Sequence, residues 1–222
     1  ERGVFRTLAR TVELDTLEAV LLYHVVPGAT ITKKAALKSD NARLATAAID
    51  WSAVTVTLVD ERWVPPADER SNERLVRTNL LQGPAAAARF EPLFEADAAI
   101  DEAVPAVSRR LGALPRPLDA VILGMGSDGH TASFFPGGDR LGDALDPVGD
   151  EAVIAMRAPG AGEPRVTLTL PRLADADFLA VHIEGAEKRD VLQQALAGTD
   201  AGEMPVRAVF ALERPIEIFW AP

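Results

Sequence analysis

The sequence predicts an α/β fold with a mostly parallel sheet and helices on both of its faces. Short apolar runs rich in β-branched residues recur along the chain, and stretches with the 3.6-residue periodicity of amphipathic helices lie between several of them. The run 118–124 is almost continuous in apolar residues, as strands buried on both faces tend to be. Strands that alternate with helices favour a parallel sheet between two helical layers.

Ten segments carry this prediction. The expected strands are 53–59, 118–124, 152–156, 166–170, 178–183, 207–212 and 216–220. Helix 71–81 begins with good capping residues, and helices 100–111 and 186–197 each carry an apolar stripe at helical spacing. Segments 136–149 and 158–164 are rich in glycine, proline and acidic residues, which predicts surface loops.

Length and charge limit the class of protein. A chain of 222 residues that is 48% hydrophobic can bury a large core, so we expect one domain over residues 1–222. The 33 acidic and 23 basic residues give a net charge of −10, which argues against nucleic-acid and anionic-membrane partners. A small anionic substrate stays open, because a few basic side chains can make a local positive pocket.

The sequence also bears on redox chemistry and location. It contains no cysteine, which excludes disulfides, thiolate metal sites and a cysteine nucleophile. The longest apolar run, 19–27, is too short to span a bilayer, and the first residues lack the pattern of a secretory signal. We therefore expect a soluble, cytoplasmic protein. For the oligomeric state a monomer is the default expectation and an oligomer the alternative.

The loop that follows strand 118–124 is the strongest candidate for chemistry. Ligands of parallel α/β sheets bind beyond the carboxyl ends of the strands. Gly126 and Gly129 allow the backbone to turn sharply and to approach a ligand, and backbone N–H groups there could bind an anion or an oxyanion. His130 can act as a base near neutral pH, and Asp128 can orient its ring. The alternative is a solvated histidine on an ordinary turn, since a glycine-rich turn by itself is a weak signal.

Two further loops carry charges at strand ends. Asp60, Glu61 and Arg62 directly follow strand 53–59, where they could bind a phosphate or move a proton, or form a local salt bridge that caps the strand. Lys188 lies in the first turn of helix 186–197, a position that the helix dipole disfavours unless an anion is shared there. The alternative is a surface lysine paired with a neighbouring glutamate.

The other histidines and the common catalytic motifs add nothing to these candidates. His24 and His182 lie in apolar runs, where we expect structural roles. No histidines have the H-E-x-x-H spacing of a zinc site, and no G-x-S-x-G elbow marks a serine nucleophile.

Taken together, four segments resemble the 6-phosphogluconolactonase family over roughly residues 49–222. They are VTVTLVDERWVPPADERSN, LDAVILGMGSDGHTASFFPG, RVTLTLPRL and GAEKRDVLQQAL, in the order of that family. The resemblance implies a Rossmann-like α/β enzyme that hydrolyses 6-phospho-D-glucono-1,5-lactone to 6-phosphogluconate in the oxidative pentose phosphate pathway. It also implies that no metal or cofactor is needed.

The resemblance assigns roles to the candidate residues. It implies that His130 is the general base for water, that Asp128 and the loop glycines belong to the active-site loop, and that Asp60 and Arg62 lie in the cleft. Lys188 corresponds to a lysine near the substrate phosphate.

Glucosamine-6-phosphate deaminase/isomerases share the D-G-H loop, but they carry an Asn-Glu pair before the following proline. Here Phe134 and Phe135 precede Pro136, which favours a lactonase and leaves the deaminase as the alternative function.

The segment 1–48 departs from the family pattern. It lacks the S-G-G-S-T-P loop that grips the substrate phosphate, and LEAVLLYHVVPGATITKKAALKSDNARL resembles a fragment of a fasciclin-type domain instead. One interpretation makes 19–26 a strand, 27–32 a loop and 33–39 a helix, so that Gly28, Thr30 and Thr32 replace the missing phosphate loop. The alternatives are a structural replacement with weak phosphate binding, or a chimeric or degenerate protein that binds sugar phosphates without catalytic activity.

Overall fold

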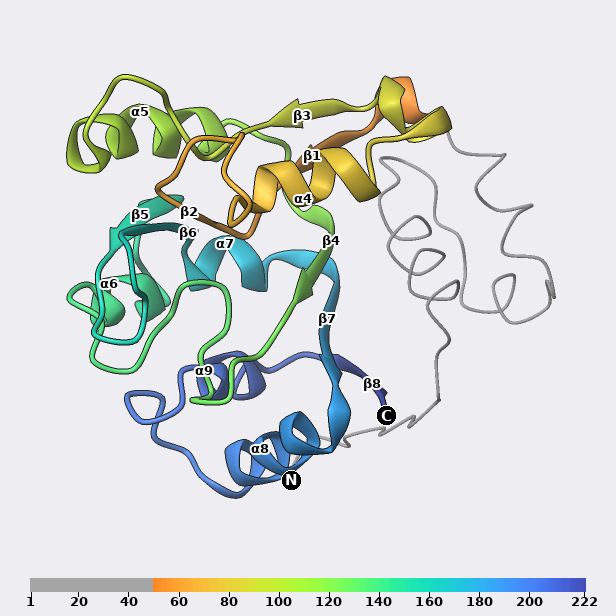
Figure 1. The fold of residues 1–222 in the computed structure, drawn as a ribbon. Helices are drawn as coiled ribbons and strands as arrows, with labels where there is room; N and C mark the ends of the chain where they lie inside the picture. The colour runs from red at the N-terminus through yellow and green to blue at the C-terminus, as the bar shows by residue number, and fades with distance from the viewer. Residues whose placement is uncertain (1–49) are drawn as a thin grey trace, which may run out of the picture.

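The computed structural model describes residues 50–222 (Figure 1). The elements in chain order are η1 (Trp51–Ala53), β1 (Thr55–Thr57), β2 (Asp60–Arg62), α4 (Asn72–Asn79), η2 (Gly83–Ala87), β3 (Arg89–Glu91), α5 (Ile100–Gly112), β4 (Leu118–Leu123), α6 (Leu141–Leu145), β5 (Val153–Met156), β6 (Arg165–Leu168), α7 (Leu170–Ala174), β7 (Ala176–Glu184), α8 (Gly185–Ala197), α9 (Val206–Phe210) and β8 (Glu217–Ala221). Within this range no helix has both the length and the apolar composition that a membrane crossing requires.

The strands pair in three groups. Strands β4, β7 and β8 form a parallel sheet with β7 in the centre, and β1 pairs with β3 in parallel. Strands β2, β6 and β5 form an antiparallel sheet with β6 in the centre, in which Arg62 lies opposite Arg165. Helices α7 and α8 pack against β7, and α5 packs against β5. The predicted α/β fold with parallel strands and flanking helices is confirmed, whereas the antiparallel group was not predicted.

The centre of the parallel sheet is buried because the adjoining parts of β4 and β7 are apolar. Leu123, Leu179, Ala180 and Val181 are almost completely inaccessible, and they belong to β4 and its neighbour β7. Helix α5 adds a stripe of buried residues at helical spacing, namely Ile100, Ala103, Val104, Val107 and Leu111. The core therefore fixes the end of β4, from which the 124–130 loop projects.

Most of the predicted elements are present, with shifted ends. Helices 71–81, 100–111 and 186–197 correspond to α4, α5 and α8, and strand 118–124 corresponds to β4. The predicted loop 136–149 contains the short helix α6, so the loop prediction is wrong for Leu141–Leu145. Strand 166–170 ends earlier than predicted, because helix α7 begins at Leu170.

The prediction of a strand at 207–212 is wrong, because this segment forms helix α9. Val206 and Val209 are both fully buried, and residues three apart share one face of a helix but not of a strand. Arg207, between them, donates hydrogen bonds to the carbonyl oxygens of Gln194 and Ala195 near the C-terminus of α8. These contacts with α8 stabilise the helical conformation.

Candidate active site

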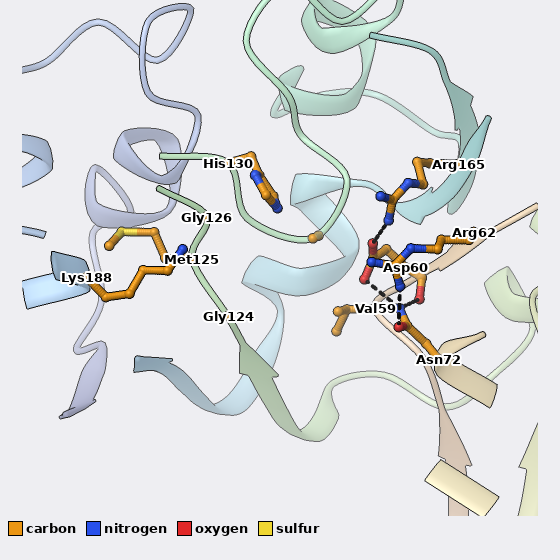
Figure 2. A pocket seen from close by; sticks show the side chains of 11 residues that line it. Val59, Asp60, Arg62, Asn72, Gly124, Met125, Gly126, His130, Arg165 and Lys188 are labelled. Atoms are coloured by element: carbon orange, nitrogen blue, oxygen red, sulfur yellow. Dashed lines mark hydrogen bonds and ion pairs between the residues drawn. The ribbon is translucent and has the colours of Figure 1, made fainter. Parts of the chain in front are cut away.

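A pocket of about 340 Å³ lies at the carboxyl end of β4 (Figure 2). Its lining comes from five parts of the chain: the segment from Val59 through β2, the start of α4, the loop after β4, the start of β6 and the first turn of α8. The lining residues are Val59, Asp60, Arg62, Asn72, Gly124, Met125, Gly126, His130, Ala132, Arg165 and Lys188. The pocket therefore brings together candidates that are far apart in the sequence.

His130 presents its imidazole ring to this pocket (Figure 2). Its Nδ1 lies 2.6 Å from Oδ1 of Asp128, and its backbone N–H donates to the same oxygen at 3.1 Å. An ionised carboxylate only accepts hydrogen bonds, so the proton belongs on Nδ1 and the lone pair on Nε2. The ring also stacks on Phe135, with 4.3 Å between the ring centroids. In its neutral form the histidine is thus held in the tautomer that a general base needs.

Asp128 is kept ionised beside this histidine. Burial works toward a higher pKa, but the hydrogen bonds and the charge of His130 outweigh it, and the pKa of Asp128 falls below its usual value. A carboxylate that stays charged at neutral pH can stabilise the imidazolium that forms when His130 takes a proton.

The glycines of the loop allow it to fold around His130. A Cβ atom at Gly126 would lie 2.1 Å from Nδ1 of His130 and 2.6 Å from Oδ1 of Asp128. Gly129 has a φ of +76°, and a Cβ there would lie 2.8 Å from Met204. The N–H of Gly126 donates to the His130 carbonyl oxygen at 2.8 Å, and that of Gly129 donates to the Gly126 carbonyl oxygen at 3.1 Å. Both N–H groups are therefore used inside the loop, and direct contact of these glycines with a substrate stays a prediction.

Asp60 is a largely buried carboxyl group on the opposite wall of the pocket, and its side chain is 14% exposed. Its Oδ2 accepts a hydrogen bond from Oγ of Ser133 at 2.6 Å and lies 3.9 Å from Nη1 of Arg165. Burial raises the pKa of Asp60, although Ser133, Arg165 and His130 each act to lower it.

Glu61, next in the chain, points away from the pocket and caps helix α4. It is completely buried and accepts hydrogen bonds from the N–H groups of Arg62, Asn72 and Glu73 and from Oγ of Ser71, at 2.7 to 3.0 Å. A negative charge at a helix N-terminus is favourable. Sequence reasoning left Glu61 among the charged candidates; its structural role follows from a contact between β2 and a helix eleven residues later.

Three cationic side chains line the pocket. Arg62 is held by the Arg70 carbonyl oxygen at 2.7 Å, by Oδ1 of Asn72 at 3.3 Å and by Glu163, whose Oε1 lies 3.2 Å from Nε. Lys188 donates from Nζ to Oγ of Ser127 at 3.2 Å. The third cation is Arg165.

Against these cations the lining offers a single carboxylate, Asp60, so the pocket is electropositive in a chain of net charge −10. This pattern suits a small anion.

Arg165 and Asn72 are lining residues that the sequence did not single out. Arg165 opens a buried strand and is only 9% exposed. A charged residue is almost never buried without a partner, so an arginine within the apolar run of β6 was the available signal. Asn72 follows the N-cap of α4 and donates from Nδ2 to the Asp60 carbonyl oxygen at 3.0 Å.

The sequence candidates divide into three groups. His130, Gly126, Asp60, Arg62 and Lys188 line the same pocket. Asp128 does not line the pocket but contacts Nδ1 of His130, and Gly129 packs against Met204. Gly28, Thr30, Thr32, His24 and the expected strand, loop and helix over 19–39 lie outside the residues that the structure describes.

His182 and the two phenylalanines have structural positions. His182 lies in β7 and does not line the pocket; burial lowers its pKa, and Glu184 opposes this shift. Phe134 and Phe135 are fully buried, and Phe135 supports the ring of His130.

Comparison with known proteins gives consistent relatives. The family model described as Glucosamine-6-phosphate isomerases/6-phosphogluconolactonase matches residues 24–220, so the match begins inside the atypical segment 1–48. The 6-phosphogluconolactonase of Rhizobium meliloti is 56% identical over 175 residues, which cover 78% of this chain and 75% of that protein. The 6-phosphogluconolactonase of Mesorhizobium japonicum is 51% identical over 182 residues, covering 82% and 76%.

A solved structure agrees with these relatives. The crystal structure of a 6-phosphogluconolactonase from Shewanella baltica superposes with a TM-score of 0.75 at 39% identity, and it covers 79% of this chain and 75% of that one. The fasciclin-like resemblance of residues 1–48 is not tested by these matches and stays a prediction.

Proposed function

The chain belongs to the glucosamine-6-phosphate isomerase/6-phosphogluconolactonase family, and we infer that it hydrolyses 6-phospho-D-glucono-1,5-lactone to 6-phosphogluconate. This is a carboxylic ester hydrolysis of the oxidative pentose phosphate pathway. Relatives with more than half of their aligned residues identical carry the name of this enzyme. The observation that carries the mechanism is the His130–Asp128 pair at the wall of an electropositive pocket.

The geometry suits base-assisted attack of water. Nε2 of His130 takes a proton from water while the water oxygen bonds to the lactone carbonyl carbon, and Asp128 stabilises the imidazolium. The bond from that carbon to the ring oxygen then breaks, and the ring oxygen receives the proton from His130. The lactone carbonyl is already electrophilic, so a base and a positive environment for the oxyanion suffice.

Substrate binding is assigned to the remaining candidates. We propose that Lys188 binds the phosphate, that Arg62 and Asp60 contact the sugar from the opposite wall, and that Gly126 and Gly129 shape the loop beneath it. Gly28, Thr30 and Thr32 are proposed to complete the phosphate site. Residues 1–222 are proposed to form one domain, which the continuous family match over 24–220 supports. A cytoplasmic location and a monomeric state are proposals from the sequence.

The deaminase alternative is not favoured. The resemblance places the ring-opening glutamate of those enzymes at the position of Phe135, and here a buried aromatic ring packs against His130 instead. An aromatic side chain cannot move the proton that ring opening requires.

A lactonase assay on three proteins tests the function and the base. The rate is corrected for spontaneous hydrolysis of the lactone, and the variants His130→Ala and His182→Gln are compared with the unaltered chain. We expect His130→Ala to lower kcat by roughly a hundred-fold or more with an unchanged melting temperature. His182→Gln changes a histidine that does not line the pocket and should stay near full activity. Full turnover by His130→Ala would refute the mechanism, and release of ammonia from glucosamine 6-phosphate would support the deaminase instead.

A further inference from the structure

The pocket has cationic groups at two separate ends. Figure 2 shows Lys188 on one side of the 124–130 loop and Arg62 and Arg165 on the other, with His130 between them in this view. The lactone carries one anionic group, its phosphate. The product carries two, because hydrolysis creates a carboxylate at the far end of the carbon chain. A pocket with two cationic ends fits the product and the transition state better than it fits the substrate.

Arg165 has an available donor at its end of the pocket. Its Nε and Nη2 atoms donate to the carbonyl oxygen of Ala161 at 3.3 and 3.0 Å, which fixes the guanidinium plane. Its Nη1 makes no hydrogen bond within residues 50–222; it forms only a long ion pair with Oδ2 of Asp60, at 3.9 Å, which is beyond hydrogen-bond distance. Arg62 differs because its charge is already paired closely: its Nε lies 3.2 Å from Oε1 of Glu163, and its Nη1 donates to the Arg70 carbonyl oxygen and to Oδ1 of Asn72.

Arg165 is also close to the proposed base. The ring of His130 stacks on Phe135 at 4.3 Å between centroids, and the guanidinium carbon of Arg165 lies 5.3 Å from the centroid of the same ring. The two groups are therefore held by one rigid, buried side chain, and both line the pocket. Both groups therefore border the space in which the carbonyl group of a bound lactone would lie.

The carbonyl oxygen needs such a donor. The N–H groups of Gly126 and Gly129, which the sequence suggested for an oxyanion, donate to carbonyl oxygens inside the loop. A fixed charged donor in a site of low dielectric stabilises an oxyanion strongly, because it needs no reorganisation during the reaction.

We propose that Arg165 is a catalytic residue whose Nη1 binds the lactone carbonyl oxygen, stabilises the oxyanion and then holds the carboxylate of the product. This proposal rests on the proposed function and on Lys188 as the phosphate ligand. In the addition step the carbon–oxygen π pair moves to the carbonyl oxygen as water adds and His130 takes its proton. In the second step the electron pair returns to the carbon–oxygen bond, the bond to the ring oxygen breaks, and that oxygen takes the proton from His130. The carboxylic acid so formed releases its remaining proton to solvent and becomes the carboxylate. Arg165 stays protonated throughout.

Two ligands test the two ends of the pocket independently. 6-Phosphogluconate carries both the phosphate and the carboxylate, and glucitol 6-phosphate has a CH₂OH group in place of the carboxylate. We expect the unaltered protein to bind 6-phosphogluconate roughly ten- to a hundred-fold more tightly, the effect of one charge-assisted hydrogen bond. Arg165→Gln should remove this preference and leave the affinity for glucitol 6-phosphate unchanged. Lys188→Gln, as the matched control, should lower the affinity for both ligands by a similar factor.

The kinetic constants of the Arg165 variants test the same role. Arg165→Gln should lower kcat by roughly a hundred- to a thousand-fold, as the loss of one oxyanion donor does, with a small change in KM, and Arg165→Lys should recover part of the loss. The proposal would be overturned if Arg165→Gln lowered the affinity for both ligands equally, or if its kcat stayed within a few-fold of the unaltered value.

The comparison of the two ligands on the unaltered protein needs no variant to fold, and equal affinities there would also overturn the proposal. A chain that shows the ligand preference but does not hydrolyse the lactone would instead refute the proposed function.

Discussion

Replacing Gly126 by alanine tests whether the loop positions His130. Gly126 carries no side chain at the place where the imidazole lies, and an added Cβ would be 2.1 Å from Nδ1 and 2.2 Å from Cε1 of His130. It would also be 2.6 Å from Oδ1 of Asp128. Real Cβ contacts are almost never shorter than 3.0 Å, so the histidine ring must move by about 1 Å or more.

This movement breaks the contact between His130 and Asp128. The hydrogen bond between Nδ1 of His130 and Oδ1 of Asp128 is 2.6 Å long, and a ring displaced by 1 Å cannot keep both this bond and its stacking on Phe135. A misplacement of this size costs about a hundred-fold in rate, and the loss of a general base costs up to about ten-thousand-fold. We therefore expect Gly126→Ala to lower kcat by a factor between these values.

The matched control is Gly124→Ala in the same loop. Gly124 also lines the pocket, but a Cβ there meets no atom within 4 Å. Both variants are assayed for lactone hydrolysis, with the spontaneous rate subtracted, and both are melted to compare stability. Gly124→Ala should keep a kcat within a few-fold of the unaltered chain. If Gly126→Ala is as active as Gly124→Ala, the position of His130 does not control the reaction and the mechanism is wrong.

Two further substitutions test the carboxylates of β2. Glu61→Gln puts an NH₂ group against backbone N–H donors at the start of α4. The free energy of unfolding, measured in urea, should therefore fall by about 3–5 kcal/mol. A loss below about 1 kcal/mol would contradict the capping role. Asp60→Asn tests the pKa that burial raises above the usual 3.8. As pH rises, the unfolded chain releases this proton first, so ionisation lowers the stability of the unaltered protein but not of the variant. The gain in stability from Asp60→Asn should grow between pH 4 and pH 7, and a gain independent of pH would refute this cause.

The local sequence predicted the elements whose signals are long and periodic. Helices α5 and α8 each extend over 13 residues with an apolar stripe, and β4 is an almost continuous apolar run. The prediction at 207–212 was wrong because six residues are too few to separate the two periodicities. There, contacts between Arg207 and the end of α8 decided the conformation.

The candidate site shows the same division between local and long-range causes. The sequence by itself determined the glycine-rich loop and its His130–Asp128 pair, because both residues lie within four positions of each other and of Gly126 and Gly129, which shape the turn. Only the tertiary structure decided that Arg165 joins them. Strand β6 pairs antiparallel with β2 and places Arg165 opposite Arg62, more than a hundred residues away in the chain. Such a pairing depends on which strands pack together in the core, and no local pattern of residues records it.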